Sequence, residues 1–278
     1  SLPSAALDPA ACDAKFQTGE GGMVGYWTFD DPADPTKADY GKFNAANNGA
    51  IWTPNGVAGG AFYYDAYSGS RKKPPLSLET KPGKGITATY AVWFRHTGDE
   101  PLEVGTHRLL QNQYDPGNAS LTVGKKPDGT SWINFLACEP VPPNQKPSCV
   151  SLSATDETHD YLWDNRWHQA TVVVRGKKIT TFELWLDGSL QSERTLQLPS
   201  WLPPTDIAVG AVRELGNWLA FVDEIAVFHR PLTSDEVLDL YASSSAGSGY
   251  CGRTVELDGN AQSLGATVDI RYGPAGLG

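Results

Sequence analysis

Two short segments of the sequence combine the side-chain types that proteins use to bind sugars. One has the turn sequence YDPGN (114–118) and the other has the sequence HDYLWDN (159–165). Sugar rings pack their C–H faces on aromatic rings, and their hydroxyl groups need polar partners such as carboxylates and amides. Each segment offers both kinds of group. The candidate ligand-binding residues are Tyr114, Asp115, Asn118, His159, Asp160 and Trp163.

The 9 tryptophans fall into two groups. Four of them lie in strand-like runs and are expected in the core, namely Trp27, Trp93, Trp167 and Trp185. Other aromatic residues are less readily assigned to the core: Trp52, Trp132, Trp163, Trp201, Trp218, Tyr67 and Tyr114. For each of these, the alternative to a ligand contact is that the ring plugs the base of a loop. We expect at least one of them to meet a ligand.

The sequence lacks the patterns of the main catalytic classes. A glycosidase needs two carboxylates about 5–9 Å apart, usually acids that alternate along one strand and so share a face. Glu183 and Asp187 have a suitable spacing, but Asp187 belongs to a turn, and the adjacent Asp223 and Glu224 face opposite ways. No GxSxG segment has the strand–turn–helix frame of a nucleophile elbow. We therefore expect no catalytic residues.

The charge balance excludes two classes of partner. The chain has 22 basic and 32 acidic residues, a formal net charge of −10 and a pI of about 4.9. An acidic chain without a long Lys/Arg block is a poor binder of nucleic acid. No apolar run approaches the roughly 18 residues of a membrane span. Neither nucleic acid nor a membrane span is expected.

The four cysteines favour two disulfides. None lies in a CxxC motif and no histidine has zinc-ligand spacing from them, so a zinc site is not expected. Cys138 and Cys149 bracket a proline-rich loop, and Cys12 and Cys251 lie near the two ends of the chain. We predict the pairs Cys12–Cys251 and Cys138–Cys149. Four cysteines allow three connectivities, and four free thiols are a further alternative. Disulfides indicate an oxidising compartment, so the protein is expected to be secreted, periplasmic or at the cell surface.

Short strand-like runs must position these residues. They recur from 23–29 to 220–230, are separated by turn signals, and occur in a chain with 29 glycines and 20 prolines. This spacing predicts an all-β fold, a two-sheet antiparallel β-sandwich. One short C-terminal helix is expected near 233–241, because Thr233 and Glu236 form a capping-box pattern ahead of an apolar stripe.

Five motifs occur in an order that is typical of a known family. They are GYWTFD (25–30), GGAF (59–62), AVWF (91–94), WH (167–168) with LWLDG (184–188), and FVDEIAVFHRPLT (221–233). The pattern resembles the laminin-G-like, concanavalin-A-like jelly roll of bacterial extracellular proteins, which is related to the pentraxins. The glycine that usually precedes the last motif is absent.

The resemblance covers residues 22–243 and implies a jelly-roll domain there. Residues 1–21 are then an extended lead-in, and residues 244–278 a linker and tail tied back by Cys251. The resemblance also implies a structural calcium ion between the first and last strands, where Asp30, Asp31, Asp223 and Asn48 would supply oxygen ligands. The alternative is that Asp223 is a buried carboxylate that bonds backbone amides in a turn.

We therefore predict a non-catalytic extracellular recognition module that binds carbohydrate or a cell-surface glycan, with calcium as a stabiliser or a bridge. One alternative is a protein–protein adhesion or surface-architecture domain with an extracellular protein as its partner. A second alternative is a divergent glycoside hydrolase or polysaccharide lyase.

Overall fold

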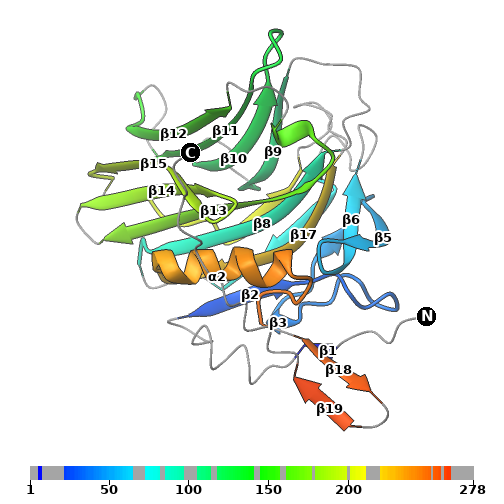
Figure 1. Cartoon of the computed structure of the whole chain (residues 1–278). Coiled ribbons are helices and arrows are strands. Elements are labelled where there is room, and N and C mark those ends of the chain that lie inside the picture. Colours follow the sequence, from blue (N-terminus) through cyan, green and yellow to red (C-terminus); the bar gives the residue numbers. More distant parts are fainter. Residues whose placement is uncertain are drawn as a thin grey trace, which may run out of the picture.

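The computed structural model describes residues 22–64, 73–81, 85–96, 105–113, 118–140, 145–156, 161–176, 179–198, 201–210 and 220–251, together with the backbone of 6–7, 253–257 and 260–263. Most of its strands form two antiparallel sheets that stack face to face (Figure 1). The predicted two-sheet β-sandwich is therefore confirmed. No helix in these residues is long and apolar enough to cross a bilayer.

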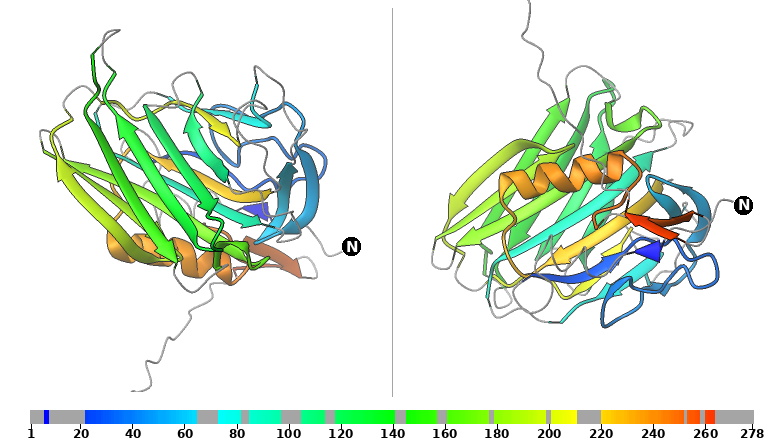
Figure 2. Two further views of the ribbon diagram at one scale, coloured as in Figure 1. Left: turned by 90° about the horizontal axis from the view of Figure 1, so that it is seen from above. Right: turned by 60° about the horizontal axis from the view of Figure 1, so that its bottom comes forward.

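The first sheet has seven strands in the order β12-β11-β10-β9-β16-β7-β4. Their bounds are β4 (Ala46–Asn47), β7 (Leu76–Glu79), β9 (Gly105–Asn112), β10 (Ala119–Lys125), β11 (Ser131–Cys138), β12 (Cys149–Asp156) and β16 (Asp206–Val209). Strands β9 to β12 follow one another along the chain and lie side by side (Figure 2, left).

The second sheet has nine strands. Seven follow the order β15-β14-β13-β8-β17-β2-β3, and β6, itself paired with β5, joins at β17. Their bounds are β2 (Met23–Trp27), β3 (Tyr40–Gly41), β5 (Ile51–Gly56), β6 (Gly59–Tyr64), β8 (Ala88–His96), β13 (Trp167–Gly176), β14 (Thr180–Leu186), β15 (Ser189–Leu196) and β17 (Ala220–Phe228). A separate three-stranded sheet contains β1 (Ala6–Leu7), β18 (Arg253–Leu257) and β19 (Asn260–Ser263).

Alternation along the strands explains why the two sheets pack. In β11, Ile133 and Phe135 point inward and are buried, whereas Trp132, Asn134 and Leu136 are partly exposed. Successive side chains of a strand face opposite sides of its sheet, so one face is apolar and the other polar. The apolar faces of both sheets meet in one large core cluster.

The helix α2 (Ser234–Ser245) covers the outer face of the nine-stranded sheet (Figure 2, right). All of β8 except Arg95 is buried, because the core covers one face of that strand and α2 covers much of the other. Trp93 stacks on Tyr241 of the helix with ring centroids 5.5 Å apart, and Val237 and Leu240 are fully buried. This second apolar layer holds the helix in place.

The helix begins with the predicted capping box. The Glu236 backbone N–H donates to Thr233 Oγ1 at 3.2 Å, and the Thr233 backbone N–H donates to Glu236 Oε2 at 2.8 Å. These bonds satisfy two backbone donors that the first helical turn would otherwise leave without partners. Arg230 Nη2 and Glu236 Oε1 form an ion pair at 2.6 Å.

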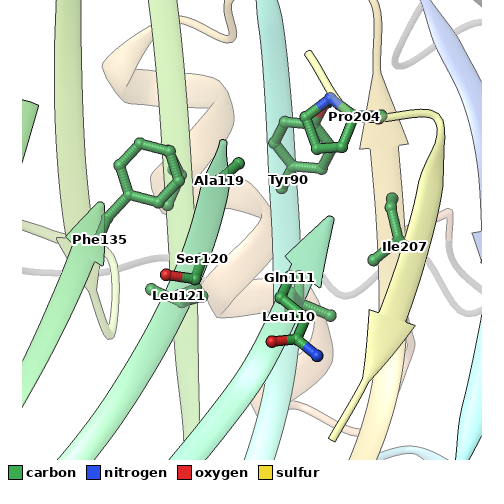
Figure 3. Close-up of a pocket in the computed structure, with 10 residues that line it drawn as sticks. Tyr90, Leu110, Gln111, Ala119, Ser120, Leu121, Phe135, Pro204 and Ile207 are labelled. Atoms are coloured by element: carbon green, nitrogen blue, oxygen red, sulfur yellow. The ribbon is translucent and has the colours of Figure 1, made fainter. Parts of the chain in front are cut away.

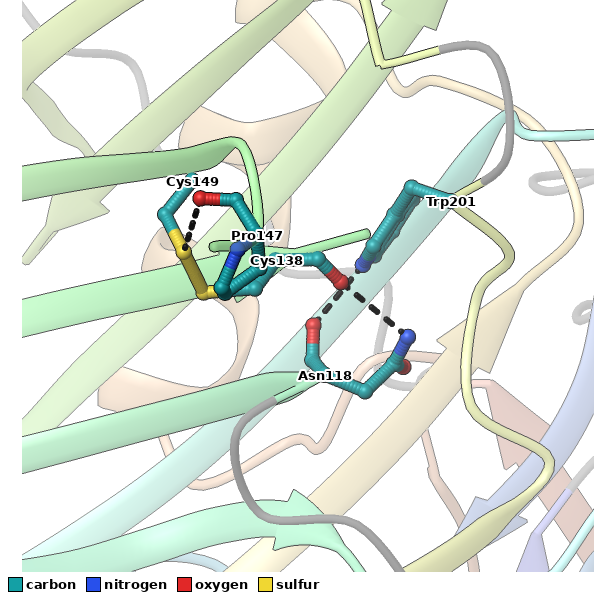
Figure 4. Close-up of a disulfide and its surroundings, with 5 residues drawn as sticks. All are labelled: Asn118, Cys138, Pro147, Cys149 and Trp201. Atoms are coloured by element: carbon teal, nitrogen blue, oxygen red, sulfur yellow. Dashed lines mark hydrogen bonds between the residues drawn. A yellow bond between two sulfur atoms is a disulfide. The ribbon is translucent and has the colours of Figure 1, made fainter. Parts of the chain in front are cut away.

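The structure contains the predicted disulfide between Cys138 and Cys149, which lie directly opposite each other on β11 and β12. Around it, Asn118 Nδ2 donates to the Cys138 carbonyl at 3.3 Å, and Trp201 Nε1 donates to the Asn118 carbonyl at 2.8 Å (Figure 4). Cys251 is also disulfide-bonded. Its predicted partner, Cys12, lies outside the described residues.

Candidate functional site

A groove of about 540 Å³ crosses the outer face of the seven-stranded sheet over β9 to β12. Most of its lining side chains are polar. The described residues that line it are Arg108, Ser120, Thr122, Lys126, Trp132, Asn134, Leu136, Ser153 and Thr155. None of these is an aspartate or a glutamate, although the chain has 32 acidic residues.

Strand register builds this groove from four strands. One cross-strand row contains Arg108 on β9, Thr122 on β10, Asn134 on β11 and Ser153 on β12. The next row contains Gly124, Trp132 and Thr155. Directly opposite residues of neighbouring strands have Cβ atoms about 5 Å apart, so each row forms one continuous surface.

Trp132 rests on Gly124. A Cβ atom added to Gly124 would lie 2.2 Å from Trp132 Cζ2 and 2.3 Å from Cε2, well inside van der Waals contact. The indole therefore occupies its position only because residue 124 has no side chain. Trp132 is partly exposed and lines the groove, so its remaining ring surface faces the groove.

The amide of Asn134 is held in a single orientation next to this ring. Its Nδ2 lies 2.9 Å from the Leu152 carbonyl, 2.8 Å from Ser151 Oγ and 2.7 Å from Ser153 Oγ. These acceptors engage the nitrogen, and no donor among the described residues bonds Oδ1. Asn134 therefore offers a fixed hydrogen-bond acceptor to the groove.

A β-bulge brings Arg108 into the same row. The pairing of β9 with β10 shifts between Leu121 and Thr122, which leaves Leu109 as an extra residue. Arg108 and Gln111 then lie on one face, and Arg108 Nη1 donates to Gln111 Oε1 at 2.7 Å. Burial lowers the pKa of Arg108 from its usual value.

The structure places the predicted ligand-binding residues away from this groove or does not describe them. Tyr114, Asp115, His159 and Asp160 lie outside the described residues. Asn118 and Trp163 are described, and both contact neighbouring parts of the protein.

Asn118 is 9% exposed, and besides its bond to Cys138 it accepts a hydrogen bond from Asn112 Nδ2 at 3.3 Å. Trp163 is part of the 3₁₀ helix η1 (Tyr161–Trp163) and packs on His96, with ring centroids 4.7 Å apart. These contacts tie both side chains to neighbouring strands and loops of the protein.

A second hollow, of about 440 Å³, lies between the edge strand β12, the β14–β15 turn and α2. Thr155 lines both this hollow and the groove, so the two meet on β12. Tyr161, Asp187 and Tyr241 also line it. The predicted segment 159–165 therefore borders a hollow of the protein through Tyr161.

His168 lies beneath this hollow in a hydrogen-bond network. Its Nδ1 is 2.8 Å from Asp187 Oδ2, and its Nε2 is 3.2 Å from Asp164 Oδ1. The Tyr161 hydroxyl donates to Asp187 Oδ2 at 2.5 Å. Burial alone would lower the pKa of His168, but the two carboxylates outweigh burial and raise it. Both ring nitrogens are engaged, so His168 holds η1 against the β14–β15 turn.

Asp223 is fully buried and accepts backbone hydrogen bonds. Its Oδ2 accepts from the N–H groups of Val57 at 2.8 Å and Ala58 at 3.3 Å, and its Oδ1 accepts from Glu224 at 2.7 Å. Val57 and Ala58 form the turn between β5 and β6, so this carboxylate closes the turn. Burial raises the pKa of Asp223 well above its usual range, and the charges of Glu224 and Asp30 raise it further.

The other predicted calcium ligands have different surroundings. Asp30 is near enough to Asp223 to affect its pKa, and its Oδ1 accepts from a backbone N–H of β6 at 2.8 Å. Asp31 is exposed and bonds the backbone two residues further on. Asn48 Nδ2 donates to the Pro74 carbonyl at 3.0 Å. No group of three or more His, Cys, Asp or Glu side chains in the described ranges could hold a metal ion.

One further pocket lies inside the sandwich, between β8 and strands β9 to β11 (Figure 3). Its lining includes Tyr90, Leu110, Phe135 and Ile207, and its volume is about 20 Å³. That space suits about one water molecule and is too small for a sugar.

The sequence does not match the profiles of known protein families, nor does it match curated proteins. Solved structures share its fold. The binding domain of botulinum neurotoxin serotype D has a TM-score of 0.57 at 11% identity, and the binding domain of Paraclostridial Mosquitocidal Protein 1 has 0.56 at 16%. The type G receptor binding domain of botulinum neurotoxin has 0.54 at 13% identity.

The matches cover 80%, 80% and 85% of this chain, but only 51%, 52% and 55% of those proteins. The chain therefore spans about half the length of the structures it resembles. At such low identity the likeness shows a shared β-sandwich fold.

Proposed function

We propose that this chain is a non-catalytic extracellular module that binds a carbohydrate in the groove over β9 to β12. The observation that carries the proposal is the position of Trp132, which rests on Gly124 beside the fixed amide of Asn134. A ring surface next to a fixed polar group is the combination that a sugar requires. The structures of similar fold are binding domains, which agrees with a binding role.

The composition of the groove supports binding without catalysis. Glycoside hydrolysis needs two carboxylates that flank the bond, and the described lining residues include none. The Cys138–Cys149 disulfide supports an extracytoplasmic location, because disulfides persist in oxidising compartments.

A glycan array followed by calorimetric titration of the best ligand tests the proposal. Trp132→Ala is expected to weaken binding about tenfold or more, because it removes the ring surface of the groove. Trp167→Ala is the matched control, since Trp167 is also partly exposed but lies on β13 of the other sheet. If no glycan binds the native chain, or if both variants bind as the native chain does, the groove is not a carbohydrate site.

We further propose that the chain is a laminin-G-like jelly roll, the family that its five motifs resemble. Calcium at Asp30 and Asp223 stays a prediction of that resemblance. The closeness of the two carboxylates favours it, whereas the three amide bonds to Asp223 oppose a ligand role for that side chain. A melting midpoint that rises with CaCl₂ and loses the rise in Asp30→Asn supports calcium binding. A midpoint that is the same in CaCl₂ and EDTA contradicts it.

A second candidate function is protein–protein adhesion through the other sheet. Cross-strand pairing aligns Ile51, Tyr63, Phe221, Arg95 and Trp167 in one row across five strands. The Arg95 guanidinium lies 4.2 Å from the Phe221 ring centroid and 5.2 Å from that of Trp167. Aromatic residues and arginine are enriched where proteins bind one another. Under this function, Trp167→Ala abolishes binding to a protein partner and Trp132→Ala has no effect.

A further inference from the structure

The groove is positively charged in an acidic protein. Its described lining contains Arg108 and Lys126 and no carboxylate, whereas the whole chain has a net charge of −10. Neither cation has a carboxylate partner among the described residues. Arg108 bonds the neutral side chain of Gln111 and is partly buried, and Lys126 is exposed. Both cations are therefore available to a negatively charged ligand.

Arg108 and Lys126 lie on either side of Trp132 along the direction of β10. Arg108 pairs across the sheet with Thr122, and Trp132 pairs with Gly124. Lys126 comes directly after the end of β10, where its backbone N–H donates to the Thr130 carbonyl, and it lines the groove. Positions 122 and 124 are about 6.7 Å apart, which is a two-residue step along a strand, and Lys126 comes two residues later. The groove therefore has one basic residue on each side of the Trp132 row.

We propose that the groove binds an acidic glycan, with a carboxylate or sulfate group on Arg108 and Lys126 and a sugar ring on Trp132. This inference rests on the proposed carbohydrate-binding function and adds the class of ligand. Guanidinium binds carboxylate and sulfate oxygens through charge-assisted hydrogen bonds, and lysine adds a second positive charge. Gln111 holds one end of the guanidinium, so less side-chain freedom is lost on binding.

Matched pairs of oligosaccharides test the proposal by calorimetry on the full chain. One pair is an oligouronate and its carboxyl-reduced form, and the other is a sulfated oligosaccharide and its desulfated form. We expect the acidic member of at least one pair to bind about tenfold or more tightly than its neutral form. Added salt should weaken binding of the acidic ligand and leave binding of the neutral form nearly unchanged.

Charge-removing variants locate the contact. Arg108→Gln and Lys126→Gln are each expected to weaken binding of the acidic ligand about tenfold. Each should change binding of the neutral form little. Arg194→Gln is the control, because it removes the same charge from an exposed position on β15. Lys126 is exposed, so its variant gives an answer even if Arg108→Gln lowers the melting midpoint.

Two results would contradict the proposal of an acidic ligand and still agree with carbohydrate binding in the groove. In one, acidic and neutral forms bind equally and only Trp132→Ala weakens them. In the other, Arg194→Gln weakens binding as much as the groove variants do, which shows a general charge effect. If no member of either pair binds and the array is also negative, both the acidic class and the proposed function fail.

Discussion

Gly124→Ala tests whether the position of Trp132 creates the binding site. The new Cβ would lie 2.2 Å from Trp132 Cζ2, and ordinary contact requires at least 3.4 Å. The ring must therefore move by about 1.2 Å, the difference between those two distances. Because the indole lies at an open groove, it has room to swing outward without disturbing the core.

The expected loss of affinity follows from the ring area that a sugar covers. An aromatic side chain buries 150–250 Å² in all, so one face contributes about 80 Å². At about 25 cal/mol per Å², that contact is worth about 2 kcal/mol, or about a 30-fold change in Kd. The free energy of unfolding should change by less than about 1 kcal/mol, which is about 2–4 °C in melting midpoint.

Calorimetric titration and thermal melting of the same Gly124→Ala sample measure both quantities. Ser120→Ala is a suitable control. Ser120 also lines the groove, but it lies in the row next to that of Arg108 and does not pair with Trp132. If Gly124→Ala binds sugar with native affinity, the ring position is irrelevant and the groove argument is wrong.

Three further predictions concern stability. His168 has a raised pKa in the folded state, so its contribution is fully present below its unfolded pKa and is lost as the pH rises through the folded pKa. Between about pH 6 and pH 8, where histidine titrates, the melting midpoint of the native chain should therefore fall relative to that of His168→Gln. Parallel curves of melting midpoint against pH for the two proteins would refute this. Replacing Cys138 and Cys149 together by serine should lower the free energy of unfolding by about 3 kcal/mol, because the disulfide closes a short loop at a sequence separation of 11. Urea unfolding measures this loss. An unchanged urea midpoint would show that other contacts hold the loop. Thr233→Ala should lower the free energy of unfolding by about 1 kcal/mol through loss of the helix cap. Thr195→Ala on exposed β15 should lower it by less. Equal losses would contradict the capping role.

Local sequence patterns predict the fold because they act within one element. The alternation of β11 places Ile133 and Phe135 inward, and Thr233 with Glu236 starts the helix, whatever lies elsewhere. Cys138 and Cys149 were also predictable, since a short loop between two strands brings its ends together.

The groove was not predictable in this way, because it depends on pairing among four strands. Trp132 was one of seven unexplained aromatic residues, and nothing local distinguishes it until Gly124 is known to lie opposite. Arg108 reaches the groove only through the bulge at Leu109. The segments that the sequence favoured have the right side chains, but composition does not say that Asn118 turns toward Cys138.

The indole N–H signals of the native chain, recorded by NMR during titration with an oligosaccharide, show whether a ligand binds at Trp132. The Trp132 signal is assigned by its loss in Trp132→Phe. If a sugar packs on Trp132, this signal moves progressively with added ligand, while those of the fully buried Trp27 and Trp201 stay in place. A saturable binding curve with no movement of the Trp132 signal would contradict binding at Trp132.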